Sequence, residues 1–119
     1  MANEANLLQN FSDSSNANIY LKDEQGRLLM VNRRVAEMFK VSKEQIIGKN
    51  NHDLIPKEEA DRIRANDSKV TEAGTPLTFK ETVTLTDGQH TFTSHKFPVS
   101  VEGSPNAVGG ISIEITDSE

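Results

Sequence analysis

The chain has 119 residues, a net charge of −5 and no cysteine. A chain of this length forms one domain that can bury a core without a disulfide or a metal. Without cysteine it has no thiolate metal ligand, no cysteine nucleophile and no thiol for a flavin adduct. Its acidic balance and scattered basic residues argue against a nucleic-acid surface. No segment has the ~20 apolar residues of a membrane span or the pattern of a signal peptide, so we expect no membrane insertion and a soluble, cytoplasmic protein.

The N-terminal part predicts a short helix and then a β-hairpin. Leu7, Leu8 and Phe11 have helical spacing, and a cluster of turn residues follows, so residues 1–17 are assigned to a helix and a loop. Residues 18–22 and 27–31 are rich in strand formers and are separated by the turn sequence DEQG.

Two short helices are predicted next. Asn32 lies at the N-cap position before residues 33–41. Ser42, with Gln45 three residues later, has the spacing of a capping box, and this second helix should end at Gly48.

A longer helix is predicted from Pro56 to Ala73, ended by Gly74. Its apolar stripe is thin, consisting of Ala60, Ile63 and Val70, so most of the helix is expected to be solvated.

Three strand-like runs complete the chain, at residues 77–86, 90–102 and 107–116. Two strands, three helices and three more strands predict an α+β domain with an antiparallel sheet covered by helices on one face.

In this order, the segments resemble a bacterial PAS sensor domain of the S-box type. The similarity lies in IYLKDEQGRLLMVNR, SKEQIIGKNNHDLIP, GTPLTFKETVTLTDGQHTFTSHKFPV and VGGISIEITD, and it spans residues 18–117. The resemblance implies a five-stranded antiparallel sheet that, with its helices, encloses a pocket for a small molecule, here preceded by an N-terminal capping helix. It also implies a role in signal transduction, with an attached output domain such as the histidine kinase of a two-component system, a cyclase or a chemotaxis transducer.

The sequence departs from the family's flavin-adduct and haem members. The photosensors have an Asn-Cys-Arg motif where this chain has Asn50, Asn51 and His52. Oxygen-sensing haem members carry their proximal histidine in the long helix, where the matching position is close to Ile63. The resemblance therefore implies neither a cysteinyl-flavin adduct nor haem held by the usual histidine, and it leaves noncovalent flavin or a metabolite open. The three histidines show no metal-ligand pattern, so no metal site is expected.

The last hairpin places two charges on an apolar face. Asp87-Gly88 predicts a two-residue turn that pairs Val83 with Phe92 and Glu81 with Ser94. Strand alternation then turns one set of side chains inward: Phe79, Glu81, Val83, Leu85, His90, Phe92, Ser94 and Lys96. The opposite face carries mostly threonines, which suit solvent.

Glu81 and Lys96 would lie diagonally across this hairpin, within reach of each other. One interpretation is a partly buried ion pair, near break-even in free energy, that fixes the strand register. The other is that Lys96 anchors an anionic ligand such as a carboxylate, with Ser94, Tyr20 and Ser112 supplying hydrogen bonds and Glu81 setting selectivity. The two are compatible if a ligand exchanges for the Glu81 contact.

Other candidate positions come from the family resemblance, which implies that Tyr20, Leu28 and Met30 also face inward. His52 has two interpretations: a hydrogen-bonding or pH-sensitive pocket group, or, with Asp53, a partner for backbone groups in the turn before Pro56. No catalytic residue is predicted. The candidate ligand-binding residues are Tyr20, Met30, His52, Phe79, Glu81, Phe92, Ser94, Lys96 and Ser112.

The outer sheet face predicts a partner surface. Ile111, Ile113 and Ile115 would be exposed there beside Ile19 and Leu21. Either the N-terminal helix covers this face within one chain, or the helix and the face form a parallel homodimer, as the resemblance implies. The signal would leave near residues 114–117.

Two other classes of function are compatible with the residues. One is a small enzyme in which Glu81 and His52 abstract a proton, although no orienting residue or oxyanion donor accompanies them. The other is a ligand-free dimerisation or scaffold domain whose pocket is filled by its own side chains.

Overall fold

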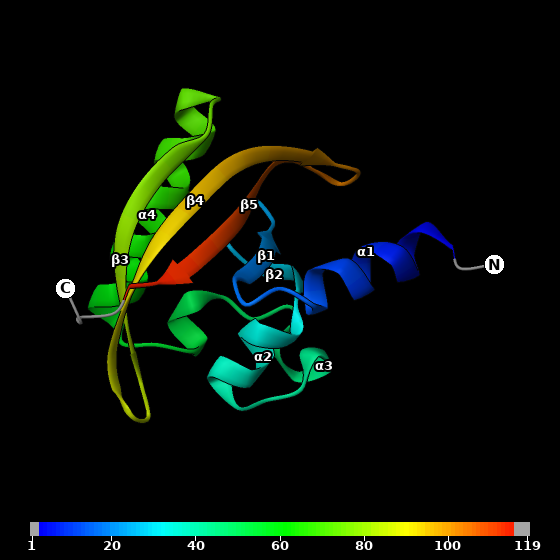
Figure 1. Cartoon of the computed structure of the whole chain (residues 1–119). Coiled ribbons are helices and arrows are strands. Elements are labelled where there is room, and N and C mark those ends of the chain that lie inside the picture. The colour runs from blue at the N-terminus through cyan, green and yellow to red at the C-terminus, as the bar shows by residue number, and fades with distance from the viewer. Residues whose placement is uncertain (1–2, 116–119) are drawn as a thin grey trace.

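Five strands pair into one antiparallel sheet in the order β2-β1-β5-β4-β3 in the computed structural model, which describes residues 3–115 (Figure 1). The elements are α1 (Glu4–Asp13), β1 (Asn18–Lys22), β2 (Leu28–Val31), α2 (Arg33–Phe39), α3 (Lys43–Ile46), the 3-10 helix η1 (Asn51–Asp53), α4 (Lys57–Ala73), β3 (Leu77–Leu85), β4 (Gly88–Val101) and β5 (Ser104–Glu114). The predicted α+β fold is confirmed. The predicted end of the last strand, residue 116, and half of the predicted signal exit, residues 116–117, lie outside the described residues.

The predicted N-caps Asn32 and Ser42 and the C-terminal Gly74 are confirmed. However, α2 ends at Phe39 and α3 at Ile46, earlier than predicted, and Pro56 is the N-cap of α4 rather than its first residue. The Asn32 side chain accepts a hydrogen bond from the Val35 amide at the start of α2. Ser42 and Gln45 form the reciprocal bonds of a capping box, and Gly74 ends α4 in the left-handed conformation.

The core lies between the inner face of the sheet and the helices. Ile55, Ala60 and Ile63 pack against Val83 and Phe92 at one end. A second cluster at the other end contains Leu28, Val31, Val35 and Ile46. The helices thus cover the concave face and leave the other face of the sheet outside.

The predicted register of the β3–β4 hairpin is wrong by two residues. Leu85 pairs with Gly88, so Thr86 and Asp87 form the loop and Glu81 lies opposite Phe92. The Asp-Gly dipeptide predicts a glycine with positive φ in the turn, and Gly88 has a φ of 121°. The dipeptide does not determine which position of the turn this glycine occupies. Because the shift is even, every side chain keeps its predicted face.

Met30 was predicted to face inward and instead lies on the outer face, with 36% of its surface exposed. The cause is a bulge: Leu21 pairs with Met30, and Lys22 pairs with Leu28, so Leu29 is an extra residue on β2. Leu28 is buried as predicted, and Met30 changes faces.

The predicted N-terminal helix is present, but in the single chain it does not cover the sheet. The exposed fractions of Leu7, Leu8 and Phe11 are 58%, 61% and 78%. The helix projects from the body (Figure 1). Its C-terminal end is nevertheless fixed, since the buried Asn32 amide donates to the carbonyls of Ser12 and Ala17.

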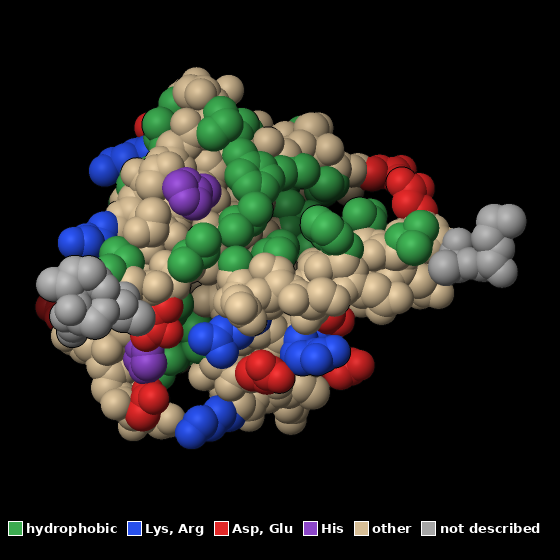
Figure 2. Space-filling view, viewed as in Figure 1, with side chains coloured by type: hydrophobic (Ala, Val, Ile, Leu, Met, Phe, Trp, Pro, Cys, Tyr) green, Lys and Arg blue, Asp and Glu red, His purple; other side chains and the backbone are tan. Residues whose placement is uncertain are grey.

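Apolar side chains remain exposed on the outer sheet face as well. They include Ile111 and Ile113 on β5 and Leu29 and Met30 on β2. Figure 2 shows apolar side chains gathered on the visible side of the molecule. No helix among residues 3–115 is long and apolar enough to cross a membrane.

Candidate ligand cavity

A cavity of about 70 Å³ lies between the inner face of the sheet and the helices. All five strands contribute to its walls, apart from the ends of the long strands. The helices α2, η1 and α4 also contribute. Apolar side chains form most of the lining, and polar side chains form one wall. The lining residues are Asn18, Tyr20, Lys22, Leu28, Val35, Met38, Phe39, Asn51, Leu54, Ile55, Ile63, Glu81, Val83, Phe92, Ser94 and Ser112.

Three hydroxyl groups on adjacent strands form a row along the polar wall. The Tyr20 hydroxyl lies 3.2 Å from the Ser112 hydroxyl, which lies 2.9 Å from that of Ser94. The ring of Tyr20 rests on Gly110, where any side chain would collide with it. Burial raises the pKa of Tyr20, so its hydroxyl is a neutral hydrogen-bonding group at physiological pH.

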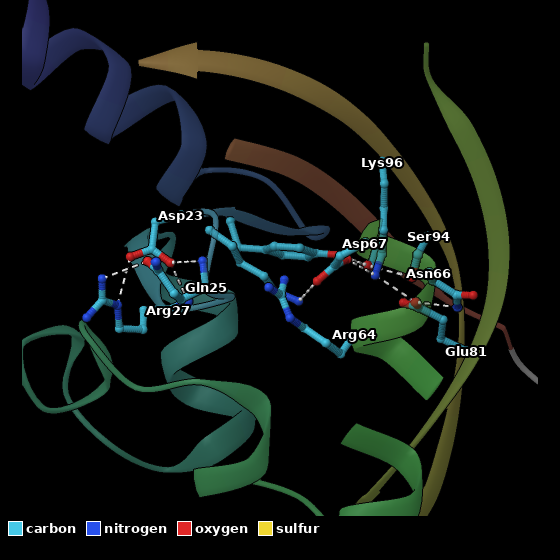
Figure 3. Close-up of polar contacts among 12 residues, drawn as sticks. Asp23, Gln25, Arg27, Arg64, Asn66, Asp67, Glu81, Ser94 and Lys96 are labelled. Carbon is cyan, nitrogen blue, oxygen red and sulfur yellow. Dashed lines mark hydrogen bonds and ion pairs between the residues drawn. The ribbon is translucent and has the colours of Figure 1, made fainter. Parts of the chain in front are cut away.

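Two buried cations and two buried carboxylates lie beside this row. Lys96 has no exposed surface and donates to Asp67 at 2.8 Å, with Glu81 at 2.6 Å. Lys22 binds the other oxygen of Asp67 at 3.0 Å. Asn66 donates to Glu81 at 3.0 Å. Figure 3 shows Lys96 extending from its strand towards Asp67 and Glu81. We use the name buried ion network for the four residues Lys22, Asp67, Glu81 and Lys96.

The two lysines of the network differ in their electrostatics. Burial opposes the charge of both ammonium groups. For Lys96 the interactions with Tyr20, Asp67 and Glu81 together outweigh burial and raise the pKa. For Lys22 burial outweighs the attraction of Asp67, the neighbouring Lys96 adds repulsion, and the pKa is lowered. Burial would raise the pKa of Asp67, but Lys22 and Lys96 lower it. At neutral pH Lys96 is therefore protonated and Asp67 is ionised.

The Glu81–Lys96 ion pair is present, although the two side chains approach from farther apart than predicted. In the observed register Lys96 pairs with Leu77, so Glu81 lies four residues along the partner strand from it. The long side chains close this gap. The pair is fully rather than partly buried, and Lys96 does not line the cavity.

The sequence analysis missed the other two members of the network. Asp67 continues the apolar stripe of α4, four residues after Ile63 and three before Val70, and is as buried as they are. Lys22 lies two residues after the inward-facing Tyr20, so strand alternation indicates its direction. A charged residue at a buried helix or strand position was the usable signal in both cases.

The remaining predicted site residues divide into two groups. Tyr20, Glu81, Phe92, Ser94 and Ser112 line the cavity, and their ligand-binding role stays a prediction. Phe79 is partly buried with the Lys96 ammonium 5.9 Å from its ring centre, outside the lining.

His52 does not face the cavity. Its exposed side chain lies 2.6 Å from Asp61 of α4. Asp53 accepts a hydrogen bond from the Asn50 amide, so that half of the turn interpretation is confirmed. Among residues 3–115, no three His, Asp or Glu side chains gather where they could hold a metal ion.

Comparison with known proteins assigns this architecture to a family. A family model described as "PAS fold" matches residues 12–119. The chain belongs to the PAS-fold family. No curated protein sequence matches it.

Solved structures similar to this PAS domain share its fold at low sequence identity. The PAS domain of a protein from Colwellia psychrerythraea has a TM-score of 0.77 and 22% identity, covering 96% of this chain and 98% of that one. The PAS domain of the Cronobacter turicensis quorum-sensing receptor RpfR, in complex with BDSF, has a TM-score of 0.72 and 22% identity, covering 86% and 96%. A Vibrio cholerae VqmA dimer has a TM-score of 0.81 and 18% identity, covering 98% of this chain and 53% of that one.

Proposed function

We propose that this PAS domain is a sensory module that binds a small molecule in the cavity and transmits binding to an attached output domain. The observation that carries the proposal is Asn18: its side chain lines the cavity, is 5% exposed, and has an amide oxygen without a hydrogen-bond partner among residues 3–115. A buried polar atom without a partner is costly, and a ligand with a donor would satisfy it.

The size of the cavity limits the ligand. Sites for drug-sized molecules have volumes of roughly 300–1,000 Å³, and this cavity has about 70 Å³. A small metabolite needs modest rearrangement of the walls, whereas a noncovalent flavin needs a large one. We therefore favour a small metabolite, in line with the ligand complexes reported for RpfR and for VqmA.

Native mass spectrometry of freshly purified protein, with an absorption spectrum, tests the proposal. We expect extra mass that is lost on denaturation, and a rise in melting temperature with a low-molecular-weight cell extract, because a ligand at 100 times its Kd stabilises by about 2.7 kcal/mol. Val83→Phe fills the cavity and should abolish both signals. Lys80→Phe adds the same side chain to an exposed position of β3 and should retain them. Absence of both signals in the wild type would contradict the proposal.

A dimerisation role is the second candidate. It is supported by the exposed Leu7, Leu8 and Phe11 of α1 and by Ile113 on the outer sheet face, which is 54% exposed. Light scattering at several concentrations, with and without residues 1–16, tests it: a dimer that requires the helix is expected, and a monomer in both forms would exclude it.

A further inference from the structure

We propose that the cavity selects an uncharged ligand with an apolar body, a hydroxyl group at one end for Asn18 and a hydrogen-bond acceptor at the other end for Lys22. This inference rests on the proposed function, since it assumes that the cavity is a ligand site, and it names the chemistry of the ligand.

The hydroxyl group follows from the side chain of Asn18. Its amide nitrogen has only the Met38 sulfur as a partner, at 3.6 Å, and a thioether is a weak acceptor. Its oxygen has no partner among residues 3–115. Exchanging the amide oxygen and nitrogen would leave a donor unsatisfied in place of an acceptor. A hydroxyl group both donates and accepts, so it satisfies Asn18 in either arrangement.

The acceptor follows from the ammonium group of Lys22. An ammonium has three donors, and within the described part of the chain this one makes a single hydrogen bond, to Asp67. The ring of Tyr20 lies 5.2 Å away and offers a weaker contact. Because Lys22 lines the cavity, a carbonyl oxygen or an aromatic nitrogen of a ligand can take up its remaining hydrogen-bonding capacity.

The shape of the ligand follows from the strand that carries both groups. Asn18 and Lys22 are four residues apart on the inner face of β1, so their backbones lie about 13 Å apart. Apolar side chains, including Phe39, Ile63 and Phe92, line the cavity. A ligand that reaches both polar groups therefore has them at opposite ends of an apolar body.

The absence of net charge follows from the buried ion network. The amino groups of Lys22 and Lys96 are already bound by the carboxylates of Asp67 and Glu81. An anionic ligand would leave a negative charge uncompensated in a buried site and would also meet Glu81 on the cavity wall. The carboxylate ligand expected from the sequence depended on Lys96, which is occupied by two carboxylates and does not reach the cavity.

The reference probe is 4-hydroxybenzamide, and two other probes each differ from it by one feature. 4-Hydroxybenzoate carries a carboxylate in place of the amide, and benzamide lacks the hydroxyl group. In titration calorimetry of the full chain at pH 7.5, 4-hydroxybenzamide should bind at least about tenfold more tightly than either of the other two probes. Asn18→Leu should lower the affinity for 4-hydroxybenzamide to that for benzamide. Lys22→Met should weaken both neutral probes, and the charge-balanced Lys22→Met/Asp67→Asn double variant repeats this test if the single variant is unstable.

Each other outcome is decisive. Equal or tighter binding of 4-hydroxybenzoate would overturn the charge argument, and unchanged affinity in Asn18→Leu would overturn the hydroxyl assignment. If no probe binds at millimolar concentration while the native mass spectrum carries a small molecule, this ligand class is wrong and the proposed function stands. If the spectrum carries none and the extract gives no thermal shift, the proposed function itself fails.

Discussion

Asp67→Asn is the substitution that most directly perturbs the interior of this PAS domain. Asp67 is 1% exposed and is the carboxylate shared by Lys22, at 3.0 Å, and Lys96, at 2.8 Å. The asparagine side chain keeps nearly the same shape and a hydrogen-bonding oxygen but removes the charge. Two buried ammonium groups are then left with only the carboxylate of Glu81.

The expected loss of stability is large because an unbalanced charge remains buried. Removing one partner of a buried ion pair costs about 3–5 kcal/mol. At roughly 4 °C per kcal/mol for a domain of this size, the melting temperature should fall by about 12–20 °C. Since small domains are stable by only about 5–15 kcal/mol, the variant should still fold but with little reserve.

Urea and thermal denaturation followed by circular dichroism measure this effect. Asp61→Asn is a matched control, because Asp61 is on the same helix, contacts His52 and forms an ion pair with Lys57 at the surface. Exposed pairs contribute little, so this control should change stability only slightly. Combining Asp67→Asn with Lys22→Met restores charge balance, and the double variant should lose less than the sum of the single losses, by about 0.5–3 kcal/mol. Asp67→Asn costing no more than Asp61→Asn would refute the network as described.

Two further predictions concern His90 on β4 and the ring of Tyr20 on β1. Hydrogen bonds that the protonated His90 ring donates to the carboxylates of Asp87 and Glu114 raise the pKa of His90. The stabilising contribution of His90 is therefore complete below its ordinary pKa of 6.5 and is lost as pH rises through the raised value. His90→Gln should therefore flatten the pH dependence of the urea midpoint above pH 6.5, and an unchanged pH profile would contradict this. Gly110→Ala should displace the ring of Tyr20, with a loss of about 1–3 kcal/mol. The chain has one tyrosine and no tryptophan, so tyrosine fluorescence reports the displacement directly, and an unaltered spectrum and quenching rate would count against it.

The faces of the long strands could be predicted from sequence, because side-chain alternation has a period of two. Glu81, Ser94 and Lys96 are buried as predicted even though the register is shifted, since an even shift preserves the faces. Met30 could not be placed, because a bulge adds one residue and reverses the alternation locally.

The buried ion network and the unsatisfied side-chain oxygen of Asn18 could not be predicted from local sequence patterns. Asp67 requires knowing that α4 packs against the strand carrying Lys96, a contact between residues 29 positions apart. Asn18 is the first residue of a strand, and nothing in its sequence neighbourhood shows that its oxygen lacks a partner. Such features depend on how elements pack, which local patterns do not encode.

The most direct test of the central claim is a ¹H–¹⁵N correlation spectrum of the full chain, recorded during titration with 4-hydroxybenzamide. A ligand in the cavity predicts the largest shifts at the inner wall, including the side-chain amide of Asn18 and the backbone amides of Tyr20, Lys22 and Ser112. The outer-face Lys80 should hardly move. Shifts confined to the outer sheet face and α1, or no shifts at saturating probe, would contradict the assignment of the cavity as a site for this class of uncharged ligand.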